Sequence, residues 1–252
     1  MDSKFKEKCI QFCADYLGGA ELPLACYYAD DPGQVKVVER PSGHRCIFAE
    51  LSQVRRGTSV CFDSGSFGCF GGRRYLGFGQ ELSPNFEYFL SCGIPGKLEG
   101  ERYKKTPELV KEIMAKVPNY EAPGKFIVFK RWDMLEASDE PDVVIFFARP
   151  DVLSGLFTLA NFDVGELNGV YSPFSAGCGS VVQYPYLEKE SKEPKAVLGM
   201  FDVSARPYIP DDVLSFSMPM KKFTTMLDNI EESFLTTASW KKILARIEKT
   251  GR

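Results

Sequence analysis

The sequence predicts an α+β protein made of two similar halves, with mixed or antiparallel sheets covered by helices. Two observations support this fold class. Apolar runs of strand length alternate with segments of helical periodicity along the chain. In addition, similar segments recur in both parts of the chain, which indicates an internal duplication. We therefore divide the chain into a first half, residues 1–120, and a second half, residues 121–252, that together form one compact unit.

Composition and charge exclude several classes of protein. The chain has 252 residues, a net charge of -3, eight cysteines and one histidine, His44. A weakly acidic chain argues against a nucleic-acid-binding protein, which usually presents a basic face. No apolar run reaches the length of a membrane span, and the charged N-terminal segment lacks the apolar centre of a secretion signal. We therefore expect a cytoplasmic protein with no nucleic-acid or membrane partner, and no metal site that needs two histidines.

The first half is predicted to alternate helices and strands. Residues 3–17 carry apolar side chains at helical spacing and stop at a glycine pair, so Cys9 and Cys13 are expected to be core thiols. Thr106 is a good helix N-cap and a proline follows it, which predicts a helix over 106–117. The other predicted elements are strands at 22–29 and 35–38, a helix at 46–56 and a strand at 59–62.

The second half is predicted to begin with two strands. The apolar runs at 125–132 and 142–148 are typical of buried strands. A helix follows from Pro150, because proline is favoured in the first helical turn. The tail, 239–250, reads as a basic amphipathic helix whose Trp240 side could form a homo-oligomer interface. Segment 213–219 resembles segment 86–95, and the other predicted elements are a strand at 196–201 and a helix from about 220 to 234.

Residues 61–79 combine two cysteines, six glycines and five aromatic residues, which predicts a glycine-rich turn. The proposed duplication aligns this region with the second half. Segment 62–69 and segment 171–178 are both rich in aromatic residues and serine, and both end in a cysteine. Cys69 and Cys178 would then occupy equivalent turns. Since ligand sites commonly lie between similar halves, we expect the two turns to converge in a cleft there.

The cysteine and glycine motifs resemble those of DUF169, a family of uncharacterised bacterial and archaeal proteins. The resemblance spans nearly the whole chain and implies that the cysteine–glycine turns belong to one shared site. It brings no established activity with it, and the additional Cys61 and Cys92 stand outside it. The resembling features are Cys46 with Ala49 and Gly57, residues 69–77, residues 175–179 and residues 210–219.

The first interpretation of the site is a pocket for a small molecule or cofactor, anionic or aromatic. The glycines would offer a nest of backbone N–H groups, and an arginine would supply positive charge. The sequence names no cofactor and no catalytic residue. The candidate ligand-binding residues are Cys69, Gly71, Gly72, Arg73, Arg74, Ser175, Gly177 and Cys178.

Three other interpretations stay open. A metal or iron–sulfur site is the second, because thiolates are soft ligands that suit zinc and iron–sulfur clusters. The third is nucleophilic or redox catalysis by Cys69, which requires a nearby cation to lower its pKa. The fourth is a structural or interaction protein whose cysteines are small core residues. The candidate metal ligands are Cys46, Cys61, Cys69 and Cys178.

Overall fold

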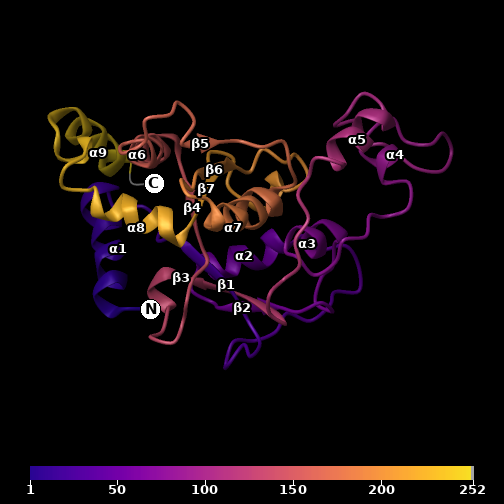
Figure 1. Cartoon of the computed structure of the whole chain (residues 1–252), viewed down its shortest axis with the longest axis horizontal. Coiled ribbons are helices and arrows are strands. Elements are labelled where there is room, and N and C mark those ends of the chain that lie inside the picture. Colours follow the sequence, from indigo (N-terminus) through magenta and orange to yellow (C-terminus); the bar gives the residue numbers. More distant parts are fainter. Residues whose placement is uncertain (251–252) are drawn as a thin grey trace.

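The computed structural model describes residues 1–250 and confirms the α+β class. One seven-stranded mixed sheet runs through the molecule in the order β2-β3-β1-β4-β7-β6-β5 (Figure 1). Only the edge pair β5–β6 is parallel among these strands. β3 of the second half lies between β1 and β2 of the first, and β1 also pairs with β4, so both halves share one continuous sheet. The strands are β1 (Leu24–Ala29), β2 (Val60–Phe62), β3 (Phe126–Arg131), β4 (Val143–Ala148), β5 (Val170–Tyr171), β6 (Ala196–Gly199) and β7 (Leu214–Pro219).

Helices cover both faces of the sheet, and two short helices lie away from it. Figure 1 shows α4 and α5 at one end of the molecule, opposite α1, α6 and α9. Among residues 1–250, no helix is long and apolar enough to cross a bilayer. The α-helices are α1 (Ser3–Tyr16), α2 (Ile47–Arg55), α3 (Phe70–Tyr75), α4 (Phe86–Phe89), α5 (Pro107–Met114), α6 (Pro150–Ala160), α7 (Tyr184–Leu187), α8 (Met220–Asp228) and α9 (Ala238–Thr250).

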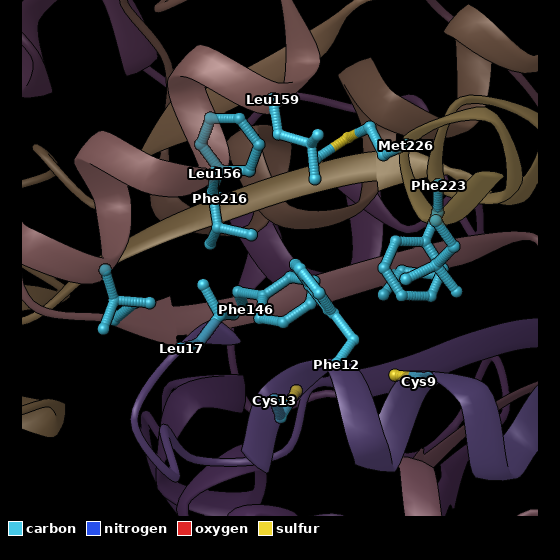
Figure 2. Packing of buried hydrophobic residues seen from close by; sticks show 14 of the residues in the cluster. Cys9, Phe12, Cys13, Leu17, Phe146, Leu156, Leu159, Phe216, Phe223 and Met226 are labelled. Carbon is cyan, nitrogen blue, oxygen red and sulfur yellow. The ribbon is translucent and has the colours of Figure 1, made fainter. Parts of the chain in front are cut away.

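One face of the sheet carries an apolar core beneath α1, α6, α8 and α9. Figure 2 shows Cys9 and Cys13 of α1 turned toward Phe146 of β4, with side chains of α6 and α8 closing the layer. Both cysteines are buried, which confirms the prediction that they are core thiols. Trp240 of α9 packs over Gly155, and its Nε1 donates to the Tyr16 carbonyl at 2.8 Å. The apolar side of α9 is therefore used inside the chain; the predicted homo-oligomer stays a prediction.

The other face carries a second core beneath α2, α3 and α7. It includes Phe48 of α2, Phe129 of β3 and Val182, which lies in the π-helix η2 (Gly179–Gln183) ahead of α7. Successive side chains of a strand point to opposite faces of a sheet. Because Phe62 belongs to this second core, its strand neighbour Cys61 points to the opposite face.

Three predictions about local structure were wrong. Predicted strand 35–38 forms only one bridge, between Val37 and Cys61, and predicted helix 220–234 contains α8, which ends at Asp228. The stretch 61–79 was predicted as a glycine-rich turn, but it contains α3. A sulfur atom caps that helix and offsets the low helix propensity of its two glycines.

Candidate cysteine site

Three cysteines lie at or near the beginning of helical segments on the second face of the sheet, and Cys178 is itself in the helical turn that precedes η2. Cys46 is the N-cap residue of α2, Cys69 that of α3 and Cys178 that of η2. The first backbone N–H groups of a helix have no partner within the helix, so an N-cap side chain can accept their hydrogen bonds. Cys69 does so: its Sγ accepts from the Gly72 N–H at 3.1 Å. Segments far apart in the sequence thus each bring a thiol to the start of a helix.

The three thiols approach one another. A Cβ on Gly71 would lie 4.0 Å from the Sγ of Cys178, so the start of α3 faces that thiol. The N–H of Ile47 lowers the pKa of both Cys46 and Cys69, which places these two sulfurs beside the start of α2. In the folded chain an ionised Cys69 raises the pKa of Cys46 and Cys178. Together Cys46, Cys69 and Cys178 are called the cysteine cluster below.

Burial keeps the cluster protonated. It raises the pKa of Cys46 to about 11 and that of Cys178 well above its usual value. Burial also raises the pKa of Cys69, but there the N–H groups of Gly72 and Ile47 lower it and offset part of the effect. Cys69 is therefore the thiol whose surroundings best support a negative charge. The groups that shift its pKa do not include the neighbouring arginines, so this geometry gives no support to an arginine-activated nucleophile.

Asp202 adds a carboxylate next to the cluster. Its Oδ2 accepts a hydrogen bond from the Gly177 N–H at 2.8 Å, and its charge raises the pKa of all three cluster thiols. Met200, two residues earlier, is buried and has a φ of 68°, a conformation that is uncommon outside glycine. Such strained positions gather at functional sites. Sequence reasoning missed Asp202, because only a tertiary contact brings this loop to Cys178.

The π-helix η2 begins directly after Cys178. π-helices are rare and occur frequently at functional sites. The whole segment is buried, and Gly199 of β6 leaves room for it, because a Cβ there would collide with Ser180. Buried polar atoms lie on this side of the molecule, where the Ser180 Oγ donates to the Gly177 carbonyl at 2.8 Å. This segment is therefore built differently from the regular helices on the first face.

Two tyrosines fix the opposite end of α3. The hydroxyl of Tyr28 lies 2.9 Å from the Leu76 carbonyl, and that of Tyr120 lies 3.1 Å from the Tyr75 carbonyl. The two hydroxyl oxygens are also 2.7 Å apart. The last carbonyls of a helix lack partners within the helix, so these contacts satisfy α3 at its C-terminal end. α3 is thus held at both ends, with Cys69 at the start.

The predicted glycines and serine have different roles in the structure. Gly72 is a packing residue, because a Cβ there would lie 2.8 Å from Ile47. Gly71 faces Cys178 and has room for a Cβ in ordinary van der Waals contact. Ser175 donates to the Ala176 carbonyl at 3.0 Å, and the N–H of Gly177 binds Asp202 as described above. The glycines therefore serve close packing and backbone contacts rather than a common nest.

The remaining predicted residues fall outside the cluster. Arg73 and Arg74 lie on the outer side of α3 and line a small hollow with Phe70. Cys61 is buried on the opposite face of the sheet, where its Sγ donates to the Val35 carbonyl at 3.5 Å. The structure therefore brings together three of the four predicted metal ligands and leaves Cys61 out.

The cluster does not form a ready metal site. Within residues 1–250, no three histidine, cysteine, aspartate or glutamate side chains are arranged to hold a metal ion. His44, the only histidine, is exposed in the loop before α2. A metal bound by Cys46, Cys69 and Cys178 would therefore require the thiols to move closer together.

Comparison with known proteins identifies the family of the chain and nothing further. The family model of DUF169, described as an uncharacterised ArCR, matches residues 14–229. The match includes all three cluster cysteines and Asp202. Neither the curated proteins nor the solved structures contain a match to the chain.

Proposed function

We propose that the chain, which belongs to the DUF169 family, binds a small molecule or cofactor at the cysteine cluster. One observation carries this proposal: Cys46, Cys69 and Cys178 come from distant segments and lie close enough to affect one another's charge, two of them at helix starts and Cys178 in the helical turn before η2. A core that only needed small apolar residues has no reason to place three thiols in this way. Asp202 and the strained Met200 beside them support the same location.

Cys69 is the main contact in this proposal. It is half-buried, and two backbone N–H groups already support a negative charge on its sulfur. A soft or electrophilic atom of the ligand would stabilise the thiolate that forms when Cys69 loses its proton. Gly71 lies beside Cys178, since an added Cβ would be in van der Waals contact with Tyr75 at 3.9 Å and with the Cys178 Sγ at 4.0 Å.

Native mass spectrometry of protein purified without oxygen tests the proposal. We expect a mass above that of the chain, released when the protein is denatured. Replacing Cys69 or Cys178 by serine should lower the occupied fraction, while Cys61→Ser, on the other face of the sheet, should leave it unchanged. Equal occupancy in all four proteins, or no added mass in any, would contradict binding at the cluster.

A metal–thiolate centre is the second candidate. It is favoured by the effect of Asp202, whose charge raises the pKa of all three thiols, and of Cys69, which raises the pKa of Cys46 and Cys178. Both effects disfavour further negative charge. A bound cation would remove this cost, and thiolates suit zinc and iron–sulfur clusters. Metal analysis and a visible absorption spectrum of the same samples distinguish this candidate from an organic ligand. Absence of both iron and zinc from reduced, anaerobic protein would eliminate it.

We infer that the two halves of the chain arose by an internal duplication, and this inference rests on two cysteines. Cys69 and Cys178 each end a similar stretch of sequence and each lie ahead of a helical segment.

A reducing cytoplasm is the setting proposed for the protein, because all eight cysteines are free and disulfides are rare in that compartment. Labelling of the intact cell with a thiol reagent that cannot cross membranes should leave the chain unmodified.

A further inference from the structure

A hollow of about 110 Å³ lies on the outer side of α3, the helix that begins after Cys69. Phe70, the residue after Cys69, forms one side of it, so the hollow begins one residue from the proposed ligand contact. Its ring is 62% exposed, which is unusual for phenylalanine and leaves an apolar surface at the entrance. The lining residues are Phe70, Arg73, Arg74, Gly79, Gln80 and Glu81.

Arg73 is held in place but keeps its terminal nitrogens free. Its Nε donates to the Phe78 carbonyl at 3.1 Å, and neither terminal nitrogen has a partner among residues 1–250. Gly79 makes this position possible, because a Cβ there would lie 2.9 Å from the same Nε. The side chain is thus fixed at its Nε while the two-pronged end of the guanidinium stays available. That end matches the geometry of a carboxylate or phosphate.

Arg74 contributes a second positive charge that no carboxylate neutralises. Its terminal nitrogens bind the Gln80 carbonyl and, at 2.6 Å, the Asn119 side chain, and its Nε is buried without a partner in the described chain. Five other arginines of the described chain pair with carboxylates, whereas Arg206 binds only backbone carbonyls. Those pairs are Arg45–Glu50, Arg55–Glu21, Arg131–Asp133, Arg149–Asp212 and Arg246–Asp151. The pair in α3 therefore presents rigid, uncompensated charge.

We propose that this hollow binds the anionic group, a carboxylate or a phosphate, of the ligand held at the cysteine cluster. The inference rests on the proposed function and adds the chemical class of the ligand. Arg73 would bind the anion through both terminal nitrogens, Arg74 would add charge, and Phe70 would contact an apolar or aromatic part of the molecule. Glu81 is the single carboxylate in the lining, so the anion is expected on the side of the two arginines.

A titration of the whole protein with inorganic phosphate and, separately, with benzoate tests the inference. Nuclear magnetic resonance should show saturable shifts of amide signals in 70–81 with at least one probe, and comparison of the two distinguishes phosphate from carboxylate. Arg73→Gln should weaken binding about tenfold or more, as expected for loss of a charge-assisted two-pronged contact. Gly79→Ala should also weaken it, because the new Cβ displaces Arg73 while its charge remains. The control is Lys241→Gln, an equal change of charge at an exposed site on α9, which should bind like the wild type.

Two outcomes would overturn the inference. One is the absence of saturable shifts with both probes. The other is unchanged affinity in Arg73→Gln when its melting temperature equals that of the wild type. The same variants separate this inference from the proposed function. If ligand occupancy falls in Cys69→Ser but not in Arg73→Gln, only the inference about the hollow is wrong. If the protein binds the anion probes but carries no ligand at the cysteines, the proposed function is wrong.

Discussion

The two faces of the sheet use the same kind of residue for different purposes. On the first face, Cys9 and Cys13 lie among aromatic and aliphatic side chains under α1 and are fully enclosed (Figure 2). On the second face, Cys46, Cys69 and Cys178 lie at helix starts, next to a carboxylate and a π-helix. The position of a thiol relative to backbone N–H groups, rather than its burial, therefore separates a core cysteine from a candidate site.

The comparison also shows where the fold tolerates irregular structure. The first face contains long, regular helices that pack through large apolar residues such as Phe146 and Phe223. The second face contains a six-residue helix, a π-helix and the strained Met200. Strained and buried polar elements cost stability. The first face is thus expected to supply most of the stability that the second face requires.

The largest expected effect is a loss of stability from a substitution in the core of the first face. Trp132 is fully buried there, and its Nε1 donates to the Lys6 carbonyl at 3.1 Å. Trp132→Ala should lower the free energy of unfolding by about 3–5 kcal/mol, measured by denaturant titration. Met134, in the same short 3₁₀ turn, is 44% exposed, so Met134→Ala should change the value by less than about 0.5 kcal/mol. Similar losses in both variants would contradict the assignment of this face as the stabilising core.

The next effect compares two adjacent glycines of α3. Gly72→Ala should lower the free energy of unfolding by about 1–3 kcal/mol, because the added methyl group would meet Ile47 at 2.8 Å. Gly71→Ala should raise it by about 0.4–1 kcal/mol, because alanine reduces the freedom of the unfolded chain and finds no atom closer than 3.9 Å. Thermal or chemical unfolding measures both. If the two substitutions shift stability in the same direction, the packing of α3 on α2 is not as described.

The second face should also give stability a dependence on alkaline pH. Because the folded pKa of Cys178 is raised, the folded state keeps its proton where the unfolded thiol, with a pKa of about 8.5, has lost it. The stability that the raised pKa of Cys178 contributes is therefore fully present below about pH 8.5 and is lost as the pH rises toward the folded pKa. Unfolding free energies measured from about pH 7 to about pH 10 should fall less steeply in Cys178→Ala, by up to about 1.4 kcal/mol per pH unit. Cys92→Ala, an exposed control, should follow the wild type.

The smallest expected effect distinguishes the role of Cys69 as a helix cap from its role as a thiol. The Cys69 sulfur accepts the Gly72 N–H, a role that a serine hydroxyl can take over. Cys69→Ala should lower the free energy of unfolding by about 1 kcal/mol through loss of the cap. Cys69→Ser should stay within about 0.5 kcal/mol of the wild type and still lose ligand occupancy. Equal destabilisation by both substitutions would show that the sulfur does not act as a cap.

Sequence reasoning reached the fold where local signals agree. Thr106 and the proline after it mark the start of α5, and the apolar run over 142–148 marks β4. It missed α3 because two glycines disfavour a helix and cysteine is not among the usual capping residues. It gave no helix at η2, where Val181 and Val182 are β-branched.

For the site, comparison of the two halves of the sequence paired Cys69 with Cys178, and the structure places both near Cys46. It also included Cys61, which strand alternation turns to the opposite face. Asp202 could not be predicted, since its place depends on a hydrogen bond to Gly177 across the fold. The arginine hollow depends in the same way on the path of the chain through Phe78 and Gly79.

The antiparallel pairing of β1 with β4 also determines when the site can form. Cys46 and Cys69 are synthesised before this strand pair exists, whereas Cys178 and Asp202 follow it in the chain. Contacts between such distant segments form late in folding, because loop closure must precede them. A chain shortened before residue 178 would contain two of the three thiols and therefore no complete cluster. If the proposed ligand binds the cluster, its binding therefore requires that segments of both halves have been synthesised and have come together.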